Sequence, residues 1–128
     1  MRRTAIVVCC MLFAGAAHGG LFPVEVETGE RVSSSGVEVE YNLFIPLQES
    51  GLPAPPWPVV LLNHGFARSK RLHANTAYHM AERGFIVLSP DQQGLGGIGS
   101  RDANISITLE HLEWLRVRGR TPGDRLEG

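Results

Sequence analysis

At 128 residues, the chain has the length of about one domain. Charged residues make up 20% of it and hydrophobic residues 43%, which is ordinary for a folded globular protein and excludes an intrinsically disordered chain. The formal net charge of -1 gives no electrostatic basis for binding nucleic acid or an anionic membrane.

The first 19 residues have the layout of a secretory signal peptide. Two arginines precede an apolar run, Ala5 to Ala14, and small residues follow it. The run is too short to span a bilayer, so we expect no stable membrane anchor. Cleavage after Ala16 and cleavage after Gly19 both fit the pattern. We therefore expect a secreted or periplasmic protein with a single mature domain, 20–128.

The residue types that usually hold metals are poorly placed in this sequence. Both cysteines, Cys9 and Cys10, lie inside the apolar run, so the mature chain would have neither a disulfide nor a thiol site. His73 and His79 are six residues apart and do not share a helix face. We expect no metal site.

Strand patterns come first in the mature chain. Residues 23–32 predict an edge strand with a turn at Thr28-Gly29. Residues 37–46 alternate between apolar and polar side chains, which predicts a half-buried antiparallel strand ended by Pro46. The runs Val59–Asn63 and Phe85–Ser89 are apolar throughout, as expected for parallel strands covered by helices on both faces.

Helical patterns alternate with these apolar strands. The segment 69–83 predicts a helix that Ser69 caps and Gly84 ends, which makes a β-α-β crossover between the two apolar strands. Its expected inward residues are Leu72, Ala77, Met80 and Ala81. A second helix is expected over 102–119, and its expected inward residues are Ile105, Leu109, Leu112 and Leu115. The predicted fold class is α/β.

The sequence His64-Gly65-Phe66 directly follows the first apolar strand. In open α/β sheets, ligands bind beyond the carboxyl ends of the strands. Gly65 would let the backbone turn sharply and approach a substrate closely. The backbone amides of Phe66 and Ala67 would then be fixed donors for a developing oxyanion. The alternative is a plain strand-to-helix turn in which His64 is a hydrogen-bonded structural residue.

The motifs PVVLLNHGF, HMAERGFIVLSPDQQG, LEWLRVR and DRLEG, in this order, resemble the N-terminal third of the α/β-hydrolase fold. The likeness is greatest to its secreted esterase, dienelactone-hydrolase-like and polyester-hydrolase-like branches, and it covers most of Val37 to Arg125. It implies a three-layer sandwich whose sheet is mostly parallel with antiparallel first strands.

The resemblance also implies an activity: hydrolysis of a small-molecule or polymeric carboxylic ester through an acyl-enzyme, without a cofactor. The Phe66 amide, with Ala67 as second choice, would help to hold the oxyanion, and Gly65 and His64 would support the turn. A second donor would come from the residue after the nucleophile.

The sequence departs from this family at the nucleophile. Such enzymes carry a serine in G-x-S-x-G, followed along the chain by an acid and a histidine. Ser100 comes nearest, but Asp102 stands where the second glycine should be. We therefore expect an incomplete domain, cut before its nucleophile, acid and catalytic histidine, and inactive as 128 residues. A non-catalytic secreted binding module and an Asp-nucleophile relative, of the epoxide hydrolase or dehalogenase type, remain as alternatives.

Two further motifs have ordinary explanations. The loop Gly94–Gly99 matches G-x-G-x-x-G, but in dinucleotide-binding folds the glycines follow the strand at once and open a helix. Four residues intervene here, which favours a loop on the rim of the active site and predicts no cofactor. Arg68, Lys70 and Arg71 cluster at a helix start, which indicates a solvated basic face or recognition of an acidic substrate group.

Overall fold

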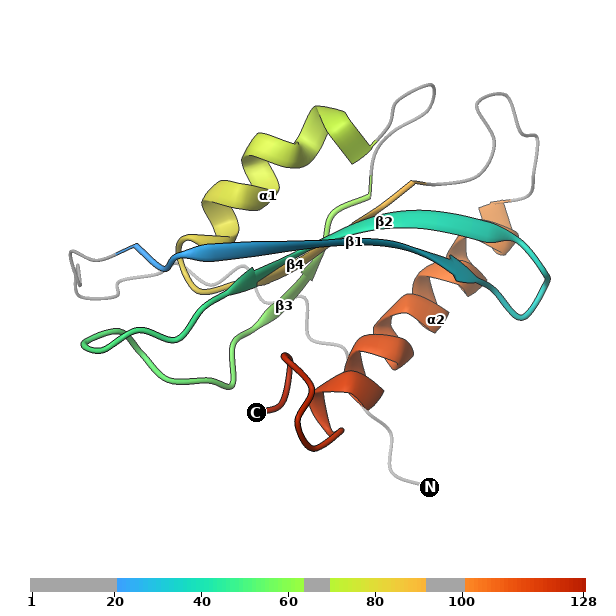
Figure 1. The fold of residues 1–128 in the computed structure, drawn as a ribbon. Helices are drawn as coiled ribbons and strands as arrows, with labels where there is room; N and C mark the ends of the chain where they lie inside the picture. The colour runs from blue at the N-terminus through green and yellow to red at the C-terminus, as the bar shows by residue number, and fades with distance from the viewer. Residues whose placement is uncertain (1–20, 64–69, 92–100) are drawn as a thin grey trace.

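The computed structural model describes residues 21–63, 70–91 and 101–128, with side chains in the last range from Asn104 onward. They form a four-stranded sheet with one helix on each face, so the described chain has three layers (Figure 1). The elements in chain order are β1 (Val24–Val32), β2 (Glu38–Pro46), β3 (Val59–Leu61), a 3-10 turn (Lys70–His73), α1 (Ala74–Ala81), β4 (Ile86–Pro90) and α2 (Arg101–Gly119).

Strands β1 and β2 form an antiparallel hairpin at the edge of the sheet, as the sequence predicts. The predicted turn at Thr28-Gly29 is wrong, because β1 runs through both residues. Gly29 pairs with Tyr41, and a Cβ on Gly29 would lie 2.7 Å from the Tyr41 hydroxyl oxygen. The glycine therefore makes room for an aromatic ring and does not turn the chain.

Strand β4 lies between the hairpin and β3, in the order β1-β2-β4-β3. It pairs antiparallel with β2 and parallel with β3, and α1 connects the parallel pair, which confirms the β-α-β crossover. The expectation of a mostly parallel sheet is wrong for the described residues, since two of the three pairings are antiparallel. A parallel pair needs a long crossover, and the described chain contains one such crossover.

Helix α1 covers one face of the sheet. Ala77 and Ala81 are fully buried against Phe44 and Val87, as their predicted inward positions require. Leu72 was expected inward but is 63% exposed, because it lies in the 3-10 turn before the helix starts. A 3-10 turn has fewer residues per turn than an α-helix, so its side chains point in directions other than those that the helical pattern predicts.

The predicted ends of α1 have different outcomes. Ser69, the expected cap, lies outside the described residues, and His73 occupies the N-cap position without a side-chain cap bond. Gly84 has φ +89° just beyond the helix, which confirms it as the C-terminal stop.

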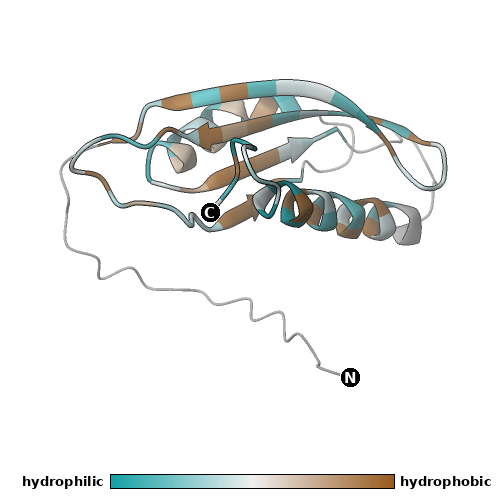
Figure 2. Ribbon diagram, turned by 60° about the horizontal axis from the view of Figure 1, so that its bottom comes forward, coloured by the Kyte–Doolittle hydropathy of each residue, from teal (hydrophilic) through white to brown (hydrophobic). Residues whose placement is uncertain are grey.

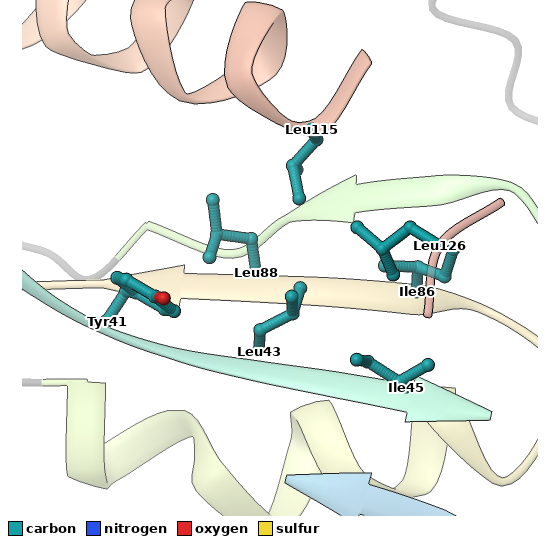
Figure 3. Packing of buried hydrophobic residues seen from close by; sticks show 7 residues of the cluster. All are labelled: Tyr41, Leu43, Ile45, Ile86, Leu88, Leu115 and Leu126. Atoms are coloured by element: carbon teal, nitrogen blue, oxygen red, sulfur yellow. The ribbon is translucent and has the colours of Figure 1, made fainter. Parts of the chain in front are cut away.

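Helix α2 and the C-terminal segment cover the opposite face. Figure 3 shows Leu115 and Leu126 directed at apolar side chains of β2 and β4. The predicted inward face of α2 is largely wrong. Among the described side chains of α2, the buried ones are Ile107, His111 and Leu115, whereas Ile105, Leu109 and Leu112, three of the four predicted inward residues, are exposed. Apolar and polar residues alternate around this helix (Figure 2), so apolar periodicity alone does not select the face that packs.

The described residues include no helix that is long and apolar enough to cross a membrane.

Candidate functional site

The predicted site belongs at the end of the sheet where β3 and β4 finish. Residues 64–67 and the glycine loop 94–99 lie outside the described residues. The described chain gives the residues that frame them: Leu62 and Asn63 come before the first segment, Lys70 comes after it, and Asp91 directly follows β4 and precedes the second. The predicted oxyanion turn therefore follows the carboxyl end of β3 in the sequence, and β4 runs parallel beside β3.

Lys70 and Asp91 form a clamp at this end of the sheet. The backbone N–H of Lys70 donates to Asp91 Oδ1 at 2.6 Å, and the Lys70 ammonium nitrogen lies 3.4 Å from Asp91 Oδ2. The same ammonium donates to Glu40 Oε2 at 2.7 Å, and only 12% of the Lys70 side chain is exposed. The clamp joins the start of the 3-10 turn to both β4 and β2.

The clamp bears on whether the basic cluster of Arg68, Lys70 and Arg71 is a solvated face or recognises an acidic substrate group. The Lys70 ammonium is engaged by two carboxylates of the protein, so it is not presented to a substrate. Arg71 is exposed, which agrees with a solvated basic face. Arg68 lies outside the described residues. Sequence reasoning missed the clamp, although an aspartate placed directly after a buried strand was a usable signal for it.

A polar groove of about 420 Å³ lies on the hairpin beside Lys70. It is lined by Thr28, Gly29, Glu30, Glu40, Tyr41 and Lys70. The pKa of Glu30 is raised by a side-chain hydrogen bond and by charge repulsion from Glu38. No group of three or more metal-ligating side chains gathers anywhere in the described ranges.

The described histidines occupy separate parts of the fold. His73 precedes α1, and His79 is an exposed residue of α1 whose Nδ1 lies 2.9 Å from Glu82 Oε2. His111 lies in α2 and is 2% exposed. These placements agree with structural or surface roles, and His64 is not described.

His111 belongs to a polar contact between α2 and the hairpin. Arg31 Nη1 donates to His111 Nδ1 at 2.7 Å, and the Arg31 guanidinium also stacks 4.7 Å from the centre of the Trp114 ring. Burial, together with the positive charge of Arg31, lowers the pKa of His111 to about 4. Within the described chain, His111 Nε2 has no hydrogen-bond partner. The imidazole is thus held neutral, in contact with the hairpin.

A second charged network ties α2 to β1. Arg118 donates to both carboxylate oxygens of Glu27, at 2.7 and 3.0 Å, and to Asp124 Oδ2 at 2.9 Å. Burial lowers the pKa of Arg118, but the two carboxylates outweigh it and raise the value overall. Tyr41 donates its hydroxyl to the same Glu27. The network is structural, because it fixes helix α2 on strand β1 of the sheet.

The described serines do not form a nucleophile elbow. Ser89 is buried in β4, and its Oγ has no partner among the described residues. Ser33, Ser34 and Ser35 lie at the hairpin turn, where Ser34 donates to Glu110 of α2. Ser100, the nearest match to the motif, is outside the described residues.

An apolar hollow of about 340 Å³ lies beside the free edge of β3. Val59 and Ile86 of the sheet, Leu112 and Leu115 of α2 and Trp57 of the proline-rich connector line it. It opens at the amino-terminal end of β3, so it is separate from the predicted oxyanion turn at the carboxyl end of the strand.

Comparison with known proteins gives partial matches. No family model matches the sequence. Chlorophyllase-2 from Arabidopsis thaliana is 31% identical over 61 residues, which are 48% of this chain and 19% of the plant protein. Brefeldin A esterase, described as a bacterial homologue of human hormone-sensitive lipase, has a TM-score of 0.59 and 18% identity, covering 75% of this chain and 28% of the esterase.

A third match is a hypothetical protein from Pseudomonas aeruginosa, with a TM-score of 0.45 and 25% identity over 53% of this chain and 21% of its own. The chain spans less than a third of the length of each of these three proteins. The described residues share their fold with part of the esterase, and the sequence match to chlorophyllase-2 agrees with that likeness. The chain is therefore related to the α/β-hydrolase superfamily and carries part of its fold.

Proposed function

We propose that this chain is part of a carboxylic ester hydrolase that acts through an acyl-enzyme. The observation that carries the proposal is the fold likeness to a solved esterase over 75% of the chain. The proposal is also supported by the sequence, since His64–Ala67 comes two residues after β3 ends, and α/β proteins bind ligands beyond the carboxyl ends of their strands.

In this proposal the backbone amide of Phe66, or that of Ala67 as second choice, stabilises the negative charge that develops on the substrate carbonyl oxygen. Gly65 permits the tight turn and His64 supports it. Removal of one such donor typically costs about 100- to 1000-fold in kcat, so the turn would be a major catalytic element. The substrate is a small-molecule or polymeric ester, and the reaction needs no cofactor.

The nucleophile is not among these 128 residues. None of the serines stands in a G-x-S-x-G frame, and Ser89 is buried in the sheet. In the proposed whole protein, the serine, the acid and the catalytic histidine come from sequence outside these residues. Residues 1–128 alone are expected to be inactive.

Hydrolysis of p-nitrophenyl acetate by the purified 128-residue chain tests this expectation. Imidazoles on a protein surface hydrolyse this ester slowly, so the urea-unfolded chain is the control. We expect the folded chain to show no saturable turnover above that control. Saturation kinetics, with labelling of a serine by a fluorophosphonate, would show that a nucleophile is present here after all.

We also propose export of the protein to the periplasm or the medium, on the basis of the N-terminal signal layout. Expression of the full sequence in a secreting host, followed by N-terminal sequencing, tests this. Export predicts a mature N-terminus at Ala17 or Gly20. A cytosolic product that starts at Met1 or Arg2 would refute it.

A further inference from the structure

We infer that the free edge of strand β3 is a dimerisation surface, on which β3 pairs antiparallel with β3 of a second copy of this chain. Strand β3 stands last in the sheet order β1-β2-β4-β3, and β4 is its only sheet neighbour among the described residues. The inference concerns the 128-residue chain itself and is independent of the ester hydrolase proposal.

The backbone of β3 has donors and acceptors that face away from the sheet. The Leu62 N–H, directly after the strand, donates to the Leu88 carbonyl oxygen of β4 at 2.8 Å. Successive residues of a strand direct their backbone groups alternately to its two sides, so Val59 and Leu61 direct theirs away from β4. Such a row of N–H and C=O groups is a template for pairing with another strand.

The two edges of the sheet differ in their side chains. Strand β1, at the opposite edge, carries four charged residues, Glu25, Glu27, Glu30 and Arg31. Charged residues on an edge strand discourage pairing with another chain. Strand β3 is Val-Val-Leu, without a charge or a proline, and its Val59 is 45% exposed. Of the two edges, β3 is therefore the one suited to pairing.

An apolar surface adjoins this edge. Val59 lines the hollow of about 340 Å³ together with Leu112 of α2. Leu112 belongs to an exposed apolar stripe of α2, because Ile105 and Leu109 precede it at helical spacing. A second copy seated on the edge would cover the hollow and part of the stripe. Burial of such apolar surface is the main driving force of protein association.

The charges around the hollow suit a second copy of the same chain. Three arginines line it, and two of them, Arg116 and Arg125, form ion pairs within the chain. The other charged side chains in the described lining are Arg120 and Glu127, one of each sign. A twofold axis places the same residues on both sides of an interface, so a surface with both signs can complement itself.

The register of the pair follows from the symmetry. Two copies of a strand related by a twofold axis across their edges run antiparallel, and Val60 is the central residue of β3. Val59 of one copy then lies opposite Leu61 of the other, and their outward N–H and C=O groups form hydrogen bonds.

Sedimentation velocity on the purified 128-residue chain, over a range of concentrations, tests the inference. We expect a monomer–dimer equilibrium. Val59→Lys places a charge inside the interface and should raise the dimer dissociation constant at least about tenfold. Leu112→Lys changes the neighbouring helix surface and should weaken the dimer without altering the strand. Leu72→Lys, at an exposed position before α1, is the matched control and should leave the dissociation constant unchanged.

Amide exchange measured by NMR on the 15N-labelled chain identifies the edge. The Val59 and Leu61 amides should exchange about tenfold more slowly in the dimer than in the monomer, because they gain acceptors there. The Leu62 amide is bonded to Leu88 in both states and should keep its exchange rate. Its protection in each variant shows that the sheet is intact.

An extended peptide or a further strand of a longer chain could also occupy this edge, and either would leave the 128-residue chain monomeric. A monomer at every concentration therefore overturns the inference. A dimer that Val59→Lys and Leu112→Lys leave unchanged, while the Leu62 amide stays protected, also overturns it. So does a dimer in which the Val59 and Leu61 amides exchange as fast as in the monomer.

Discussion

Stability should fall steeply in mild acid because of one buried histidine, His111. The imidazole is 2% exposed and accepts a hydrogen bond from Arg31, and these surroundings lower its pKa from 6.5 to about 4. The unfolded chain binds a proton at His111 below pH 6.5, but the folded chain does so only near pH 4. The unfolded state therefore binds more protons in this window, and stability decreases as pH falls through it.

The magnitude follows from the two pKa values. Linkage with a pKa of 6.5 unfolded and about 4 folded gives a loss of about 2 kcal/mol between pH 7.5 and pH 5. The total loss approaches about 3 kcal/mol below pH 4. This is a large part of the stability of a typical small domain. Glu110, which is hydrogen-bonded to Ser34 of the hairpin, opposes the effect only partly.

Urea unfolding followed by tryptophan fluorescence measures this loss, since Trp114 lies against Arg31. The variant His111→Gln cannot titrate but keeps an acceptor for Arg31, so its free energy of unfolding should change by less than about 0.5 kcal/mol over the same pH range. His79→Gln, at an exposed position, should keep the full pH dependence. Equal slopes in wild type and His111→Gln would refute the reasoning.

Two further predictions concern packing. Gly29→Ala places a Cβ 2.7 Å from the Tyr41 hydroxyl oxygen, so urea unfolding should show a loss of about 2 kcal/mol. Gly36→Ala, with φ +79° and open space, should lose only about 1 kcal/mol, and equal losses would contradict the packing argument. Arg118→Met leaves two partly buried carboxylates without their cation, and thermal unfolding should report a loss of about 3 kcal/mol. Arg116→Met removes a pair on the exposed surface and should change stability by less than about 0.5 kcal/mol, so similar effects of the two variants would contradict this account.

The strands and the crossover were predictable because their signals are local. Apolar runs bounded by turns predicted β3 and β4, and a glycine with positive φ ends the helix between them. The predicted turn at Thr28-Gly29 is wrong because a glycine indicates a turn when the residue that pairs with it across the sheet is unknown. Tyr41, which requires that glycine, is a neighbour only after the hairpin has formed.

The face of α2 could not be predicted for a related reason. The helix has apolar residues on two sides, and its exposed side carries more leucine and isoleucine than its buried side. The sheet selects the other side through pairs distant in sequence, Arg31 with His111 and Glu27 with Arg118. Apolar periodicity cannot reveal such pairs, because their residues are distant in the sequence and the β1 side chains that contact the helix are charged.

The location of the candidate site stays a prediction from the sequence, and the structure describes only the residues that frame it. A glycine and an aromatic residue after an apolar strand pointed to the carboxyl end of the sheet, and the described chain has β3 ending there. The basic cluster does not indicate the clamp of Lys70 and Asp91, because in the sequence Lys70 stands beside two arginines. Its real neighbours come from β2 and β4.

The most direct test of the central claim is to sequence the source DNA past codon 128 in all three frames. If these residues belong to an ester hydrolase, a further strand and a G-x-S-x-G motif should follow within about ten residues, with an acid and a histidine later. A confirmed stop with no such motif in any frame would contradict the catalytic account. The chain would then be a binding module built on part of the same fold.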